Sequence, residues 1–354
     1  MIQRHKFEPR LKQFDQDNGL SDLQRKIRWG VLSTSNIGRA AVIPAIQHST
    51  NGELVAVASR DSQKARDFAA KLSIPVSYNS YDALLSSKDI DAVYIPLPNS
   101  LHREWTILAA EAGKHVLCEK PLAMNSAQCL EMNNAAHRNG VKLMEAFMYR
   151  FHPQTQKVIE LVRTGAIGDL RLIHSAFTFR VTNPANIRLQ PELGGGSLMD
   201  VGCYCVNISR TVAGQEPIEV QAYANWGSTG VDDQMVANLR FSNGLLAQFD
   251  CALTLSRREF YQLVGTEGAM DVRVAFLPGT DQTTIRLQQK QNEALHKIPG
   301  VDEYRLMVEH FASCVQNDEP LRYTPAEAAA NMQVIEALYR SARHGGQPEK
   351  ISAT

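Results

Sequence analysis

A lysine at the end of a short apolar segment is the first residue of this chain that could do chemistry. His115-Val116-Leu117-Cys118 is typical of a buried strand, and Glu119-Lys120-Pro121 follows it directly. In an open parallel sheet, ligands bind just beyond the carboxyl ends of the strands, where Lys120 would lie. Because a desolvated ammonium is costly, a lysine there needs a partner or a task. The alternative is a surface turn with a solvated lysine.

A second group of reactive side chains follows three consecutive glycines. Gly194-Gly195-Gly196 precedes a segment that we interpret as a helix opening at Ser197. Asp200 and Tyr204 are four residues apart, so they would share one face of that helix. Glycines let the backbone approach a neighbour or a ligand closely, which favours a binding site. The alternative is a core tyrosine with a satisfied hydroxyl, the commoner fate of a helical tyrosine.

The elements that would position Lys120 begin with a strand, a turn of small residues and a helix. Ile27–Leu32 is predicted as a buried strand, and an apolar helix is predicted over Arg39–Gln47. This is the dinucleotide-binding pattern, in which backbone N–H groups at the helix N-terminus face a pyrophosphate. The turn has serines in place of the first two glycines of the usual Gly-x-Gly-x-x-Gly. Its predicted cofactor-binding residues are Ser33, Ser35, Asn36, Ile37 and Gly38. A plain turn between strand and helix is the alternative.

The end of the next predicted strand, Leu54–Ala58, bears on the choice of cofactor. A carboxylate at this position would hydrogen-bond the ribose of NAD, but Ser59 takes its place and Arg60 follows. A hydroxyl beside a guanidinium suits the 2′-phosphate of NADP, because arginine offers phosphate a bidentate fork. NADP is therefore favoured over NAD, with a solvated Arg60 as the alternative. Asp61 is predicted to cap a helix over Ser62–Leu72.

The remaining pattern divides the chain into two domains. Strands alternate with helices from Ile27 to about Phe147, which predicts right-handed crossovers and a parallel sheet. Beyond it, longer strands of mixed periodicity are predicted at Leu170–Arg180, Glu219–Trp226, Met235–Phe241, Leu245–Leu255, Tyr261–Gly265 and Thr284–Gln289. The predicted fold class is α/β: an N-terminal Rossmann domain with a doubly wound parallel sheet (27–147) and a C-terminal α+β domain with a large, mostly antiparallel sheet (148–322).

The two ends of the chain are assigned separately. Residues 1–26 show no strong period and are predicted to form an N-terminal arm. Thr324-Pro325-Ala326-Glu327 is predicted to be a capping box that opens a last helix ending near His344. We expect residues 323–354 to pack back near the domain junction.

Composition excludes several classes of function. Lys plus Arg and Asp plus Glu both number 37, so no net charge favours nucleic acid or an anionic membrane. No apolar stretch reaches the roughly 18 residues of a membrane helix, and residues 1–28 lack an apolar signal core. The six cysteines show no metal-binding spacing. These features predict a reduced cytoplasmic protein without a metal site.

Taken together, these motifs resemble the glucose–fructose oxidoreductase, inositol dehydrogenase and rhizopine-catabolism (Gfo/Idh/MocA) family. Four stretches carry the resemblance: Ser33–Gly38, Glu119–Pro121, Glu145–Pro153 and Gly194–Tyr204. Within the family, the chain is similar to the branch with NADP-dependent aldose dehydrogenases and dimeric dihydrodiol dehydrogenase. The resemblance implies an active site formed by Lys120, Asp200 and Tyr204, in which Lys120 and Glu119 also border the cofactor.

The implied reaction is hydride transfer between a nicotinamide and a hydroxyl or carbonyl carbon of a sugar or polyol. A free phenol has a pKa of about 10, and a nearby ammonium would lower it, so Lys120 is expected to make Tyr204 a better base. Asp200 would orient Lys120 or hold a substrate hydroxyl. Arg150 and His152 are further candidates for substrate binding, although Arg150 could equally serve a structural salt bridge.

Other parts of the site and two alternative functions complete the expectations. Pro96, Asn99 and His102 are expected to line the nicotinamide side, unless His102 only begins a helix. A dihydrodiol dehydrogenase and a redox-neutral glycosidase that retains NAD are the alternatives to an aldose dehydrogenase. A non-catalytic sensor should lack the lysine or the tyrosine. The second domain's open sheet is expected to pair with another copy, giving a homodimer or homotetramer.

Overall fold

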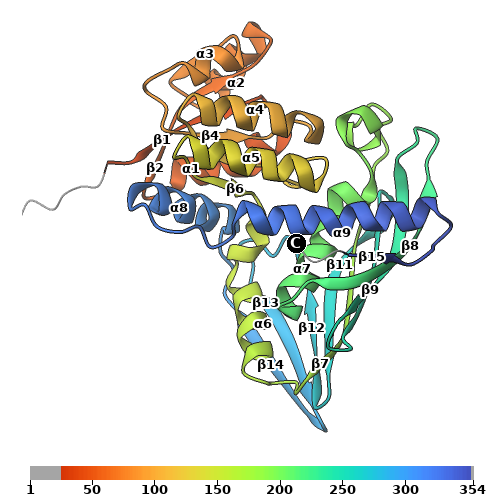
Figure 1. Cartoon of the computed structure of the whole chain (residues 1–354). Helices are drawn as coiled ribbons and strands as arrows, with labels where there is room; N and C mark the ends of the chain where they lie inside the picture. The colour runs from red at the N-terminus through yellow and green to blue at the C-terminus, as the bar shows by residue number, and fades with distance from the viewer. Residues whose placement is uncertain (1–24, 352–354) are drawn as a thin grey trace, which may run out of the picture.

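The computed structural model describes residues 25–351, which form two domains joined by long helices (Figure 1). The predicted arm lies outside this range except for Arg25 and Lys26. The domain of parallel strands and the domain built on the large antiparallel sheet lie side by side, and helix α9 (Pro325–Arg343) runs along their junction. The predicted fold class is confirmed.

The first domain contains six parallel strands in the order β3-β2-β1-β4-β5-β6. Their bounds are Ile27–Leu32 (β1), Gly52–Ala58 (β2), Val76–Tyr78 (β3), Ala92–Ile95 (β4), His115–Cys118 (β5) and Leu143–Glu145 (β6). The connecting helices are Ile43–His48 (α1), Ser62–Lys71 (α2), Tyr81–Leu85 (α3), Asn99–Glu111 (α4) and Ser126–Arg138 (α5). The order reverses between β1 and β4, so a crevice for a ligand lies beyond the carboxyl ends of these strands.

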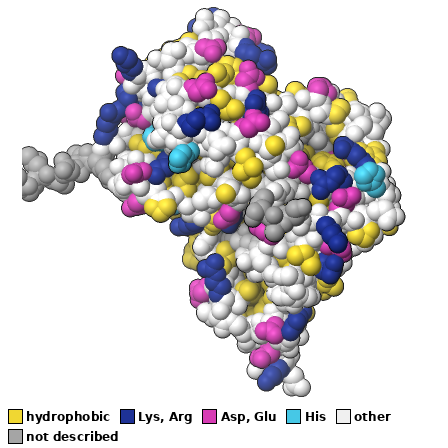
Figure 2. Space-filling view, viewed as in Figure 1, with side chains coloured by type: hydrophobic (Ala, Val, Ile, Leu, Met, Phe, Trp, Pro, Cys, Tyr) yellow, Lys and Arg dark blue, Asp and Glu magenta, His cyan; other side chains and the backbone are white. Residues whose placement is uncertain are grey.

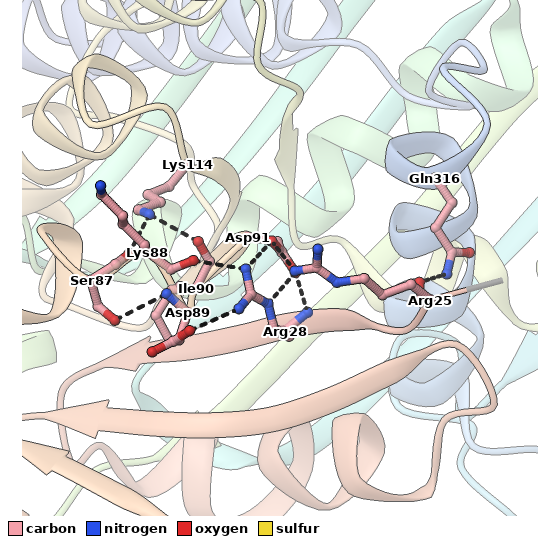
Figure 3. A network of polar contacts seen from close by, with 9 residues as sticks. All are labelled: Arg25, Arg28, Ser87, Lys88, Asp89, Ile90, Asp91, Lys114 and Gln316. Carbon is pink, nitrogen blue, oxygen red and sulfur yellow. Dashed lines mark hydrogen bonds and ion pairs between the residues drawn. The ribbon is translucent and has the colours of Figure 1, made fainter.

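At the amino ends of these strands, charged side chains form a network of ion pairs and hydrogen bonds. Arg28 donates to the Asp91 carboxylate through its backbone N–H (2.9 Å), Nε (2.9 Å) and Nη2 (2.8 Å). The Lys114 ammonium donates to the carbonyls of Ser87 and Ile90 (Figure 3). Burial raises the pKa of Asp91, but the hydrogen bonds and charge of Arg28 outweigh it and hold the pKa below its usual range. This network links the amino ends of β1, β4 and β5, whereas the crevice for a ligand lies at their carboxyl ends.

The second domain contains a nine-stranded sheet in the order β14-β13-β12-β11-β7-β10-β9-β8-β15. Its strands are Leu170–Arg180 (β7), Pro217–Trp226 (β8), Asp232–Phe241 (β9), Leu246–Ala252 (β10), Thr254–Gly265 (β11), Gly268–Arg273 (β12), Thr283–Gln289 (β13), Asn292–Ile298 (β14) and Glu349–Lys350 (β15). Only β7 and β10 pair in parallel among these described strands; the other neighbours are antiparallel.

One predicted strand of this sheet is wrong. Leu245–Leu255 reads as a single apolar run, but it supplies β10 and the start of β11, which flank β7 on opposite sides. The chain crosses the end of β7 at Leu253, whose carbonyl accepts a hydrogen bond from Val181 N–H at 2.8 Å. An apolar run does not reveal such a crossing, because the side of β7 on which each half pairs depends on the path of the chain and not on local hydrophobicity. Strands β3, β12, β14 and β15 were not predicted.

Helices of the C-terminal half pack on both domains. Helices α6 (Pro153–Arg163) and α7 (Cys203–Ala213) pack with the large sheet, while α8 (Glu303–Gln316) packs against β1, β2 and α1 of the first domain. Phe311 of α8 contacts the buried ring of Trp29, with 5.4 Å between ring centroids. Residues 303–316, which the sequence places in the second domain, therefore belong to the core of the first.

Surface and helix composition agree with the overall charge balance. On the face seen in Figure 2, lysine and arginine side chains are interspersed with aspartate and glutamate. Among residues 25–351, no helix has the length and apolar character needed to cross a membrane.

Candidate active site

The Glu119-Lys120-Pro121 turn is held from several directions. Tyr94 donates its hydroxyl to Glu119 Oε1 at 2.6 Å, and Glu145 Oε1 accepts the backbone N–H of Leu122 at 2.7 Å. His102 lies 3.0 Å from the Pro121 carbonyl through Nδ1 and 2.8 Å from the Leu97 carbonyl through Nε2. The turn that carries Lys120 is thus fixed before any ligand binds.

Lys120 reaches across the domain junction to Asp200. Its ammonium donates to the backbone carbonyl of Asp200 at 2.7 Å and to Oδ1 at 3.3 Å. Both side chains are largely buried, with 14% and 13% of their surface exposed. Burial lowers the pKa of Lys120, but Asp200, Cys203 and Glu119 together outweigh it, so the net shift is upward. Lys120 is therefore a charged ammonium with a partner, as a buried lysine requires.

Asp200 has a second cationic partner that the sequence did not single out. Arg188 Nε donates to Asp200 Oδ2 at 2.6 Å. Burial raises the pKa of Asp200, but Lys120 and Arg188 together lower it by more. The net shift is downward, and the carboxyl is ionised. The signal available in the sequence was indirect: a buried aspartate beside one lysine leaves an oxygen to satisfy, and Arg188 lies in the loop before the three glycines.

The backbone around Asp200 differs from the predicted regular helix. Leu198–Gly202 is a π-helical turn that leads into α7 at Cys203. A second π-helical turn, Gly38–Val42, precedes α1 at the predicted cofactor turn. Insertions of this kind occur frequently at functional sites. Within the first of these turns, the backbone carbonyl of Asp200 accepts a hydrogen bond from the Lys120 ammonium.

Tyr204 is packed in an aromatic cluster, and its hydroxyl donates to a methionine sulfur. Its ring contacts Phe147, Phe177 and Phe276, with centroids 5.0, 5.4 and 5.4 Å away, and its hydroxyl lies 3.6 Å from Met148 Sδ. The Lys120 ammonium lies 5.1 Å from the ring centroid. The three predicted catalytic residues therefore meet at one place.

The expectation that Lys120 lowers the pKa of Tyr204 is wrong. Burial raises the pKa of Tyr204 well above its ordinary value, and the surrounding Tyr304, Cys203, Glu119 and Asp200 add to the shift. The charge of Lys120 is neutralised by Asp200, and the phenol is desolvated, so the neutral form is favoured. Tyr204 is thus a protonated phenol.

The predicted cofactor turn has the backbone of a glycine turn. Ser33 has φ of 126°, a conformation that favours glycine, and it stands at the first glycine position of the usual motif. Ser35 Oγ accepts the N–H of Gly38 at 3.1 Å. A Cβ added to Gly38 would come within 3.0 Å of that oxygen. A small-residue cradle for a pyrophosphate is therefore present despite the serines, so these residues fit a dinucleotide.

Arg60 and a tyrosine that the sequence did not reveal lie at the end of β2. Burial raises the pKa of Tyr81, while charge and hydrogen bonding from Arg60 and a hydrogen bond from Ser33 oppose the shift. Ser59 Oγ accepts the N–H of Asp61, which caps α2 as predicted. Arg60 forms no salt bridge within residues 25–351. A guanidinium and two hydroxyls thus gather where the 2′-phosphate of NADP would lie.

On the nicotinamide side, the predicted residues have different surroundings. Pro96 is buried, and its Cγ would lie 3.8 Å from a Cβ on Gly38. Asn99, at the start of α4, donates to the Gly194 carbonyl at 2.8 Å and so connects the start of this helix to the three glycines. His102 is fully buried, and burial lowers its pKa. His102 therefore holds two loops together through its ring nitrogens, and its contact with a cofactor stays a prediction.

Arg150 and His152 are both buried and make contacts with other parts of the protein. Arg150 Nη1 pairs with Glu327 at 2.6 Å, and its guanidinium lies 3.4 Å from the Tyr323 ring centroid. His152 is buried and caps α6, with Nδ1 accepting the N–H of Gln154 at 3.0 Å. The structure favours the salt-bridge alternative for Arg150 over substrate binding, and it gives His152 a capping role, while substrate binding by His152 stays a prediction.

The same contact corrects the predicted capping box. Thr324 is the N-cap of α9, but its side chain caps no backbone N–H, and the Glu327 carboxylate turns to Arg150. A nearly buried guanidinium requires a counter-charge, and this requirement outweighs one cap hydrogen bond.

Known proteins share both domains. Residues 27–147 match the model of the oxidoreductase family with an NAD-binding Rossmann fold, and residues 155–271 match the GFO/IDH/MocA C-terminal domain. D-xylose 1-dehydrogenase (NADP(+)) 2 of Haloferax volcanii is 38% identical over 91% of this chain and 99% of its own length. Trans-1,2-dihydrobenzene-1,2-diol dehydrogenase of Xenopus laevis is 37% identical over 69% of this chain and 74% of its own length.

A solved structure is similar over nearly the same range. KijD10, a 3-ketoreductase from Actinomadura kijaniata crystallised with NADP and TDP-benzene, has a TM-score of 0.86 and 29% identity, covering 90% of this chain and 98% of its own. A lysine and a tyrosine replaced in its solved variants stand as many residues apart as Lys120 and Tyr204. With both domains matched and a relative aligned over almost its whole length, this chain belongs to the Gfo/Idh/MocA family of NAD(P)-binding oxidoreductases.

Proposed function

We propose that this protein transfers a hydride between NADP and a hydroxyl or carbonyl carbon of a sugar or polyol. The observation that carries the proposal is the meeting of Lys120, from the first domain, with Asp200 and Tyr204, from the second. A site assembled from both domains lies where the carboxyl ends of the parallel strands open. The NADP-dependent xylose dehydrogenase and the NADP-bound ketoreductase among its relatives support the same chemistry.

Each of the three residues has a role that follows from its protonation state. When bound, NADP supplies or accepts the hydride. Tyr204, a protonated phenol, donates its proton to the substrate oxygen during carbonyl reduction and becomes a phenolate; in the reverse direction the phenolate form of Tyr204 accepts the proton of the substrate hydroxyl. The Lys120 ammonium stabilises negative charge on that oxygen and is itself held by Asp200. The matching separation of the lysine and tyrosine studied in the ketoreductase supports these assignments.

NADP rather than NAD is favoured by the residues at the end of β2. Ser59 offers no carboxylate to a ribose, and Arg60, which forms no salt bridge within residues 25–351, lies beside Tyr81 and provides donors for a phosphate. The serine turn from Ser33 to Gly38 would hold the pyrophosphate.

The proposed substrates share one chemical feature. Xylose and a 1,2-dihydrobenzene-1,2-diol, named for two relatives, both carry oxygens on neighbouring carbons. Oxidation of a dihydrodiol is therefore the second candidate function, supported by the Xenopus relative. The two candidates use the same catalytic residues and differ only in the ring that the site must accept.

The outward face of the large sheet supports assembly into a homodimer or homotetramer; the cytoplasmic location stays a prediction. Tyr223 and Val236 are cross-strand neighbours on β8 and β9, and both are exposed, as is Leu246 on β10. Exposed apolar side chains on one open sheet commonly mark an interface. Light scattering at micromolar concentration should give at least a dimeric mass, and a monomeric mass would contradict this assignment.

The reaction is tested with a panel of aldoses, inositols and dihydrodiols, each with NADP and NAD, followed by absorbance of the reduced nicotinamide. Lys120→Met should abolish turnover while NADPH still binds, as measured by its fluorescence. Lys157→Met, on the surface of α6, serves as the matched control and should keep full activity. Undiminished turnover in Lys120→Met would exclude the catalytic role of Lys120.

A further inference from the structure

Arg188 is a cationic side chain at the site to which neither the family resemblance nor the motifs assign a role. It lies on a short 3-10 turn, Ile187–Leu189, and Asn186 caps this turn by accepting the N–H of Arg188 at 3.0 Å. Its Nε binds Asp200 Oδ2, so one carboxylate joins Arg188 to Lys120. The two cationic groups are therefore neighbours.

The three glycines fix the position of Arg188. Gly196 N–H donates to the Arg188 carbonyl at 2.9 Å, and Gly195 N–H donates to the Gln190 carbonyl at 3.0 Å. A Cβ on Gly195 would clash with the Arg188 carbonyl, and Gly194 and Gly196 have φ of 78° and 120°. The glycines that suggested close approach to a ligand thus let the Arg188 loop lie against the start of the Asp200 helix.

The Arg188 side chain has hydrogen-bond donors without a partner among the described residues. Among the described residues, Nε is its side chain's only hydrogen-bonding atom, and neither Nη1 nor Nη2 has a partner. The guanidinium lies 5.7 Å from the Phe179 ring centroid, and 38% of the side chain is exposed. The Asp200 carboxylate raises the pKa of Arg188, so its guanidinium is charged. An arginine that is held by its Nε and free at both terminal nitrogens is suited to bind a further oxygen.

We propose that Arg188 binds the substrate oxygen on the carbon next to the reacting carbon, and so selects substrates with two oxygens on neighbouring carbons. This inference rests on the proposed function. Tyr204 and Lys120 would hold the reacting oxygen, while Arg188, oriented by Asp200, donates to its neighbour. A site built to hydrogen-bond a hydroxyl discriminates strongly against an analogue that lacks it, because the donor is then left unpaired.

The test crosses a change in the protein with a change in the substrate. Wild type and Arg188→Met are assayed with D-glucose and 2-deoxy-D-glucose, and with trans-cyclohexane-1,2-diol and cyclohexanol. For wild type we expect kcat/KM to fall about 100-fold when the neighbouring oxygen is absent. Arg188→Met should lose about 100-fold on the complete substrate and less than about 5-fold on the analogue. Arg188→Lys keeps the positive charge, so its kcat/KM on the complete substrate should lie between those of wild type and Arg188→Met.

Two controls separate a contact with substrate from a role in folding. Arg286→Met removes an exposed arginine of β13 that pairs with Glu293, and it should leave kcat/KM unchanged for both members of each substrate pair. NADPH affinity of Arg188→Met should equal that of wild type. Equal losses on both members of a pair, or no loss on either, would overturn the role of Arg188. Absence of turnover by wild type with all four compounds and the wider panel would instead refute the proposed function, and this inference with it.

Discussion

The ammonium of Lys120 donates a hydrogen bond to the backbone carbonyl of Asp200 at 2.7 Å, and these residues come from different domains. This contact makes the active site a property of the domain junction. It also means that Lys120 is charged and paired before a substrate arrives. In the proposed mechanism the proton donor is therefore the neighbouring phenol, whose neutral state burial favours.

Replacing Tyr204 by Phe should remove the proton donor and leave the aromatic cluster intact. We expect kcat/KM for carbonyl reduction to fall by about 100- to 10,000-fold with NADPH affinity unchanged. Because the pKa of Tyr204 is raised above its ordinary value of 10.0, ionisation of this phenol should not reduce the wild-type rate below pH 10. Steady-state kinetics against pH provide the measurement. Tyr223→Phe, on exposed β8, is the control, and a comparable loss in it would contradict the assignment.

Replacing Asp200 by Asn should leave Lys120 without its main counter-charge. Burial then lowers the pKa of Lys120 below its ordinary 10.5, so the alkaline limb of the pH profile should move to lower pH. We expect kcat to fall about 100- to 1,000-fold near neutrality, the loss typical of a misplaced charge-stabilising group. Asp281→Asn, on an exposed loop, should behave as wild type. An unshifted profile in Asp200→Asn would show that Asp200 does not set the protonation of Lys120.

Replacing Arg60 by Ala should weaken NADP binding selectively. A charge-assisted hydrogen bond to phosphate contributes about 1.5–3 kcal/mol, so KM for NADP should rise by about 10- to 100-fold while KM for NAD stays constant. Arg66→Ala, on the exposed side of helix α2, which begins just after Arg60, controls for the loss of a nearby positive charge. If both cofactors lose equally, Arg60 does not read the 2′-phosphate.

Glu145 should make the stability of the protein depend on pH near neutrality. Burial raises its pKa from 4.5 to about 7. Between these values the folded state holds a proton that the unfolded state has released, so stability falls as pH rises from 4.5 to about 7 and is constant above. Glu145→Gln should remove this fall and be about 1–3 kcal/mol more stable than wild type at pH 8. Urea unfolding from pH 5 to 8 provides the measurement, with exposed Glu160→Gln as control.

Much of the fold follows from local sequence. Ile27–Leu32 and His115–Cys118 are strands at the predicted residues, and Asp61 caps its helix, because strand burial and caps depend on nearby side chains. The split of 245–255 into two strands and the packing of α8 on the first domain were not predictable. They depend on which side of β7 the chain passes and on a partner, Trp29, far away in the sequence.

For the site, the sequence alone determined which chemical groups are available: an ammonium at a strand end, a carboxylate and a phenol four residues apart, and a turn of small residues. Tertiary structure decided which of these groups meet and in which protonation state. Arg188 and Tyr81 enter, His102 and Arg150 turn to structural contacts, and Tyr204 is neutral rather than a phenolate. The reason is physical, since desolvation and pairing depend on every neighbour in space, and the decisive neighbours here come from other segments of the chain.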